Sequence, residues 1–209
     1  GWTDSDSAVL GVNTTNNNFE FNDPATNISE ASVRDLGSAL SDSQWVMDFD
    51  TNFSALSSGT TDGALIWVGI SDAVQTTTLG TQDMIAWVFS QETSSKEWGA
   101  DDLDGGSFSA AIAHQSNENL VINTTYYWRI VRVSNTAYSV IKYADSSRTI
   151  ELNRVEGTVS ATTTGLRYVK VIINGAASAN NIEGTINKIR IWDGITNPVN
   201  QEVATFSDD

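Results

Sequence analysis

The sequence predicts an all-β domain, a sandwich of two antiparallel sheets. Short runs of β-branched and aromatic residues recur along the chain, separated by clusters of Gly, Asn, Asp and Ser, a pattern typical of such sandwiches. Only 18% of the residues are charged, whereas long helices are usually rich in Glu, Lys, Ala and Leu. The 209 residues fit one large sandwich, so we expect a single domain that covers residues 1–209.

The predicted strands follow one another from end to end of the chain. The clearest runs are Ser43–Phe49, Ala64–Ile70, Met84–Phe89, Tyr126–Val133, Ala137–Tyr143, Arg148–Leu152, Arg167–Ile173 and Ile186–Trp192, and the weaker ones are Ser7–Val12, Asn18–Asn22 and Gly157–Ala161. Turn residues between the runs predict a three-strand meander from Tyr126 to Leu152. In Ser29–Leu40 the apolar residues have helical spacing, and there we expect at most one or two helical turns.

Charge and composition limit the partners that the protein can have. The formal net charge is −15, from 26 acidic and 11 basic residues, so we expect neither nucleic acid nor an anionic membrane as a partner. The chain has no cysteine, which excludes a disulfide framework and cysteine metal sites. It begins at Gly1 rather than Met, and we expect it to be a piece of a longer extracellular protein that is secreted or belongs to a cell surface or a virion.

Strand alternation predicts which side chains of Ser43–Asp50 are buried. Trp45, Met47 and Phe49 share one face of this strand, and Asp48 and Asp50 lie on the other. A sandwich buries one face of each sheet, so we expect the aromatic face to be the core and the two aspartates to face outward.

The last strong run shows the same alternation. Ile189 and Ile191 share one face, and Lys188, Arg190 and Trp192 share the other. The second group is therefore predicted to lie on an outer face, as Asp48 and Asp50 do.

Four segments, in this order along the chain, carry a family resemblance. They are Asp35–Phe49, Thr124–Tyr143, Leu166–Ile173 and Gly184–Ile195 (GTINKIRIWDGI). The last resembles the closing strand G-x-I-D-D-V-x-I-Y-D-G of laminin-G-like domains in the concanavalin A-like superfamily, found in microbial and viral surface proteins. The resemblance implies a two-sheet jelly-roll sandwich, a fold shared by lectins, adhesion modules and polysaccharide-degrading enzymes. Asn187-Lys188 replaces the acidic pair of that pattern, which weakens any metal role there.

The resemblance implies a non-catalytic carbohydrate-binding or adhesion module whose partner is a glycan or polysaccharide. Sugar rings stack on exposed indoles, so Trp98 and Trp192 are the candidate platforms, and Arg190, Asp48 and Asp50 are candidates for binding hydroxyl groups. Two alternatives stay open, namely a structural or assembly domain of a surface or viral appendage, and a polysaccharide-degrading hydrolase or lyase.

Enzyme activity has less support in the sequence than binding does. Glycoside hydrolysis needs two carboxylates about 5–10 Å apart, and the hydrolases that share this fold place them as E-x-D-x-x-E, a spacing that is absent here. Asp48 and Asp50 are the nearest substitute. The single histidine, His114, lacks the Arg-rich strand motif of the lyases. We therefore favour binding and predict no catalytic residues.

The acidic segment Thr93–Ser107 is predicted to be an exposed hairpin tip. It places Asp101, Asp102 and Asp104 directly before a Gly-Gly pair, and calcium binds to flexible acidic loops that contain glycine. The sequence therefore predicts these three carboxylates as candidate ligands of a structural calcium ion, with a solvated loop as the alternative.

Overall fold

The computed structural model describes residues 2–4, 10–13, 15–16, 18–24, 29–57, 64–74, 81–91, 96–108, 113–115, 120–175, 181–198 and 204–205. Throughout this part of the chain the regular structure is β-strand, with no helix and hence none that could cross a membrane. The strands are β1 (Trp2–Asp4), β2 (Leu10–Asn13), β3 (Asn18–Pro24), β4 (Ser29–Asp35), β5 (Trp45–Ser57), β6 (Ala64–Ser71), β7 (Met84–Gln91), β8 (Lys96–Asp104), β9 (Ser107–Phe108), β10 (Ala113–Gln115), β11 (Thr125–Arg132), β12 (Ala137–Tyr143), β13 (Glu151–Thr158), β14 (Tyr168–Gly175), β15 (Asn181–Asp193) and β16 (Ala204–Thr205).

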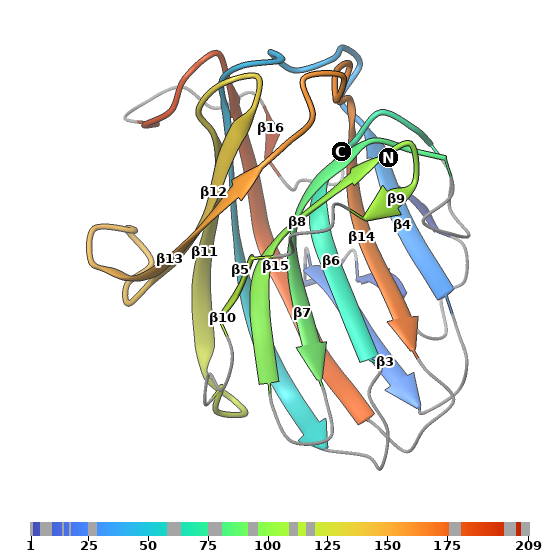
Figure 1. Ribbon diagram of the computed structural model, residues 1–209. Coiled ribbons are helices and arrows are strands. Elements are labelled where there is room, and N and C mark those ends of the chain that lie inside the picture. The colour runs from blue at the N-terminus through green and yellow to red at the C-terminus, as the bar shows by residue number, and fades with distance from the viewer. Residues whose placement is uncertain are drawn as a thin grey trace.

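These strands form two antiparallel sheets that pack face to face (Figure 1). Sheet A has the order β1-β4-β14-β6-β7-β8-β10, with β9 paired to β8. Sheet B has the order β13-β12-β11-β5-β15-β3-β2, with β16 paired to β15. In both sheets a late strand lies between early ones, β14 between β4 and β6 and β15 between β5 and β3. The predicted two-sheet jelly-roll sandwich is confirmed.

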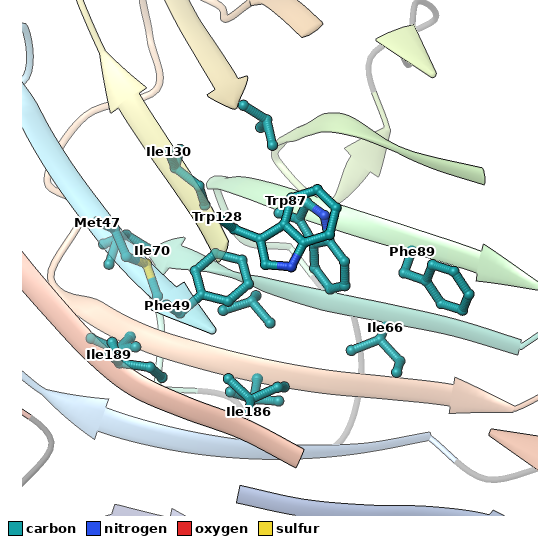
Figure 2. Packing of buried hydrophobic residues seen from close by; sticks show 14 of the residues in the cluster. Met47, Phe49, Ile66, Ile70, Trp87, Phe89, Trp128, Ile130, Ile186 and Ile189 are labelled. Carbon is teal, nitrogen blue, oxygen red and sulfur yellow. The ribbon is translucent and has the colours of Figure 1, made fainter. Parts of the chain in front are cut away.

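Aromatic rings from both sheets fill the space between them (Figure 2). The ring of Trp87 on β7 lies 5.5 Å from that of Phe49 on β5 and 5.2 Å from that of Trp128 on β11. Trp98 on β8 lies 5.0 Å from Trp128 in an edge-on arrangement. All four rings are fully buried, and such pairs contribute about 0.5–1.5 kcal/mol each beyond the area that they bury.

Two segments differ from the sequence expectations. The predicted helical turns in Ser29–Leu40 are wrong, because Ser29–Asp35 forms β4 between β1 and β14. The predicted exposed tip in Thr93–Ser107 is also wrong, because Lys96–Asp104 forms β8, hydrogen-bonded to β7 and β10 inside sheet A. Tertiary pairing thus overrides local composition in both places.

The predicted meander is confirmed, with a shift in its third strand. β11, β12 and β13 are antiparallel neighbours in sheet B. The third strand begins at Glu151 rather than at Arg148, because residues 144–150 form a turn closed by Asp145, whose carboxylate accepts hydrogen bonds from the backbone N–H groups of Thr149 and Ile150.

Replacement of Trp98 by Ala tests whether this ring belongs to the core. We expect Trp98→Ala to lower the free energy of unfolding by about 3–5 kcal/mol, because a large cavity forms beside Trp128. Urea denaturation measures the loss, and Val74→Ala at an exposed position serves as the control. A Trp98→Ala protein as stable as the parent contradicts the packing described above.

Candidate functional site

The outer face of sheet B brings together the side chains that strand alternation predicted. Asp48 on β5 lies opposite Arg190 on β15 in the backbone register of the two strands. Trp192 lies two residues further along β15. Ile189 and Ile191 are buried in the core between the sheets, so Arg190 and Trp192 face outward. The predicted outward orientation of these side chains is confirmed. The expected exposure to water is wrong for Asp48, Asp50 and Trp192, which are 2–8% exposed because neighbouring side chains of the same face cover them.

Lys188 joins the same surface at a β-bulge. The register of β15 against β5 shifts between Asn187 and Arg190, and Lys188 has a φ of 53°, in the left-handed region. Its side chain is 65% exposed, and its ammonium group lies 3.4 Å from the carboxylate of Asp50.

The two aspartates are held by arginines of the same face. Arg129 donates from Nε and from a terminal nitrogen to the two oxygens of Asp48, at 2.7 and 2.8 Å. Arg148 lies 2.7 Å from Asp50 and 3.3 Å from Asp48. Asp48 and Asp50 are each only 2% exposed. The prediction that they bind ligand hydroxyls directly stays untested, but this geometry gives them the role of fixing the arginines.

Arg148 connects the turn before β13 to the centre of sheet B. It has a φ of 55°, and its guanidinium donates to the carbonyl oxygens of Trp128 and Phe49 as well as to Asp50. The turn that carries it is itself stabilised, because the backbone N–H of Ile150, together with Thr149, lowers the pKa of Asp145 to about 2. Arg148 therefore ties two neighbouring strands to one turn.

Each of three arginines on this face lies over an aromatic ring. The guanidinium carbon lies 5.6 Å from the ring of Tyr143 for Arg129, 6.0 Å from that of Tyr127 for Arg148, and 5.9 Å from that of Trp192 for Arg190. These distances suit cation–π attraction. We name this surface the arginine–aromatic patch, and it consists of Asp48, Asp50, Tyr127, Arg129, Tyr143, Arg148, Lys188, Arg190 and Trp192.

Arg190 differs from the other two arginines of the patch. Among the described residues its guanidinium meets the ring of Trp192 and no carboxylate, and its Nε is buried without a hydrogen-bond partner. Trp192 is 8% exposed, so only part of its indole is open to a ligand. The patch thus contains one cation without an ion pair in the described structure, beside an indole that is largely covered.

Trp98 is not a surface platform. It is fully buried and packs against Trp128 in the core. The prediction that it presents an exposed indole is wrong, because alternation along β8 directs Trp98 and Ala100 between the two sheets.

The three acidic residues of the predicted calcium loop do not converge. Asp101 and Asp102 are successive residues of β8, so their side chains point to opposite faces of sheet A. Both are buried, whereas Asp104 is exposed at the end of the strand. Within the described ranges no three His, Cys, Asp or Glu side chains are arranged to hold a metal ion, so the donor set does not fit calcium. The side chain of His114 lies outside the described residues.

A second polar cluster, which the sequence analysis missed, lies on the outer face of sheet A. The indole Nε1 of Trp67 donates to Asp101 at 2.8 Å. Lys170 and Ser71 both donate to the side-chain oxygen of Gln82. Asp101 Oδ1 and Gln82 Nε2 are buried and have no hydrogen-bond partner. Buried polar groups are usually paired, so these two atoms stand out.

Burial shifts the proton affinity of both charged groups in this cluster. It raises the pKa of Asp101 to about 7, against the hydrogen bond from Trp67, which acts to lower it. It lowers the pKa of Lys170 to about 8. In the sequence, each of these two residues lies two positions from an apolar residue of the same strand face, Leu103 in β8 and Ile172 in β14.

The shifted pKa of Asp101 predicts how stability varies with pH. The folded protein holds the Asp101 proton more tightly than the unfolded chain, whose pKa is near 3.8. This contribution is fully present below about pH 4 and is lost as the pH rises through about 7. Asp101→Asn keeps an acceptor for Trp67 without a charge. Its free energy of unfolding, relative to that of the parent, should therefore rise by about 4 kcal/mol between pH 4 and pH 8.

Urea denaturation of both proteins at the two pH values measures this gain. Asp104→Asn removes the same charge from the exposed end of β8 and controls for net charge. The raised pKa of Asp101 is contradicted if Asp101→Asn is less stable, relative to the parent at the same pH, at pH 8 than at pH 4.

Comparison with known proteins identifies the fold. No protein-family model matches the sequence, and a search of curated proteins finds no match. A legume lectin-like domain from Entamoeba histolytica is similar in structure, with a TM-score of 0.54 at 10% identity, over 92% of this chain and 89% of that one. A functionally unknown protein from Saccharomyces cerevisiae has a TM-score of 0.54 at 10% identity, over 96% and 97% of the two chains.

Alginate lyase A1-II', a member of polysaccharide lyase family-7, is also similar in structure. It has a TM-score of 0.54 at 13% identity, over 91% of this chain and 85% of that one. Identities of 10–13% support a statement about fold alone. The chain has a two-sheet jelly-roll sandwich fold similar to that of these proteins, as the sequence resemblance implied.

Proposed function

We propose that this chain is a non-catalytic glycan-binding module of a secreted, cell-surface or virion protein, and that the arginine–aromatic patch holds the glycan. The proposal rests mainly on the position of Arg190. Its guanidinium contacts no carboxylate of the described residues, and it lies over the ring of Trp192. A sugar offers an apolar C–H face to an indole and oxygen atoms to a guanidinium. Arg190 and Trp192 together match both features.

The remainder of the patch supports binding by holding its side chains in place. Arg129 and Arg148 are fixed by Asp48 and Asp50, so they lose little conformational freedom when a ligand arrives. Side chains that are ordered before binding reduce the entropy cost of association. The patch is therefore ordered before a ligand arrives, and the groups on it that a saccharide can reach include Lys188, Arg190 and the exposed edge of Trp192.

The fold comparison gives independent support. Two of the similar solved structures have names that refer to carbohydrate, a legume lectin-like domain and an alginate lyase. Because their identities to this chain are low, these names assign no role to any residue of the patch.

Binding is favoured over catalysis on this face for a geometric reason. Both oxygens of Asp48 accept from Arg129, and one oxygen of Asp50 accepts from Arg148 while the other lies 3.4 Å from the Lys188 ammonium. Glycoside hydrolysis needs two carboxyl groups that can reach the glycosidic bond. The aspartates of the patch are engaged by cations instead.

A glycan array followed by calorimetry on the glycans that bind tests the proposal. Trp192→Ala should weaken binding by about tenfold, because it removes the ring on which the sugar packs. Trp192→Phe, which keeps packing against the neighbouring apolar side chains, should weaken binding less.

Tyr168→Ala provides a matched control on sheet A, because Tyr168 also lies beneath an arginine, with the guanidinium of Arg167 5.6 Å from its ring. Glycan affinity should be unchanged in this variant. A folded parent protein that binds no glycan on the array contradicts the proposed function, and release of reducing ends or unsaturated sugars from a polysaccharide identifies an enzyme instead.

A further inference from the structure

Positive charge is concentrated on the arginine–aromatic patch. The whole chain has 26 acidic and 11 basic residues and a net charge of −15. The patch nevertheless holds four cations and only two carboxylates, and the cations are Arg129, Arg148, Lys188 and Arg190. Within the patch the cations therefore outnumber the carboxylates by two. On the same face, Arg154 of the neighbouring β13 pairs with Glu151 and Glu156.

This surplus lies on β15. The carboxylates of Asp48 and Asp50 are bound by Arg129 and Arg148. What remains is Arg190, which has no ion pair in the described structure, and Lys188, whose exposed ammonium has only the longer 3.4 Å contact with Asp50. These two cations are separated by one residue along the chain and face the same side of the sheet.

We propose that the glycan held by this patch is acidic, a polysaccharide that bears carboxylate or sulfate groups. This inference rests on the glycan-binding function proposed above. A guanidinium can donate two parallel N–H bonds to a carboxylate or sulfate, and such charge-assisted bonds are the strong ones. Arg190 receives the acidic group, Trp192 supports the sugar ring, and Lys188 meets a second acidic group further along the polymer.

The overall acidity of the protein is compatible with an acidic ligand. Charges on the surface are screened over about 8 Å at physiological salt, so an acidic sugar on the patch responds mainly to the cations nearest to it. The same screening makes the affinity depend on salt, which a ligand held by stacking alone does not show.

Two matched pairs of polysaccharides test the charge requirement. Polygalacturonate and its fully methyl-esterified form share a backbone and differ in carboxylate charge, and dextran sulfate and dextran differ in sulfate charge. The parent protein should bind the charged member of at least one pair about tenfold more tightly than the neutral member. Affinity electrophoresis measures the difference, which should shrink at about 0.5 M NaCl.

Two variants test whether the patch is the site that prefers the charged polymer. Arg190→Gln should reduce the preference for the charged polymer several-fold, because Lys188 is the only cation without a close ion pair that it leaves in the described part of the patch. Arg167→Gln removes the same charge from an exposed pair with Asp35 on β4 and should retain the preference. Melting temperatures of both variants verify that they are folded.

The outcomes separate this inference from the function on which it rests. Equal binding of charged and neutral members in both pairs overturns the acidic-glycan inference and leaves glycan binding standing. An undiminished preference in Arg190→Gln also overturns it, because the acidic group is then held elsewhere. A parent protein that binds none of the four polymers and nothing on the glycan array overturns the proposed function itself.

Discussion

The aromatic rings between the two sheets are the contact on which the rest of the structure depends. Trp87 of sheet A packs against Phe49 and Trp128 of sheet B, and the chain has no cysteine that could crosslink the sheets. Burial of Phe49 directs its neighbours Asp48 and Asp50 outward, because successive strand residues point to opposite faces. The arginine–aromatic patch is thus a direct consequence of the core.

The buried carboxylates on the outer faces of the two sheets differ in their partners. On sheet B, Asp48 and Asp50 meet arginines, and removal of one partner of such a pair is costly because the other is left buried and unpaired. On sheet A, Asp101 keeps one oxygen without a partner, and burial raises its pKa. The outer face of sheet B is therefore ordered by its ion pairs, while burial of Asp101 on sheet A should make the stability of the protein depend on pH.

Strand alternation in the sequence predicted the orientation of β5 and β15, because the contrast between apolar and charged positions is strong there. It could not predict the position of Arg148, since this side chain depends on a left-handed turn residue and on contacts with Phe49 and Asp50, 99 and 98 positions away in the chain. Trp98 and Asp101 were misplaced for a related reason. Acidic residues and glycines usually mark exposed turns, and only the pairing of β8 with β7, and the bond to Trp67, bury this segment.

We propose above all that a glycan binds to the outer face of sheet B beside Trp192. The seven tryptophan indole N–H groups give separate reporters in a two-dimensional ¹H–¹⁵N spectrum during titration with a polysaccharide. A glycan bound beside Trp192 should shift the indole signal of Trp192 in proportion to the bound fraction, while the signals of the core residues Trp87, Trp98 and Trp128 stay in place. Shifts at Trp67 of sheet A with an unchanged Trp192 signal would contradict it.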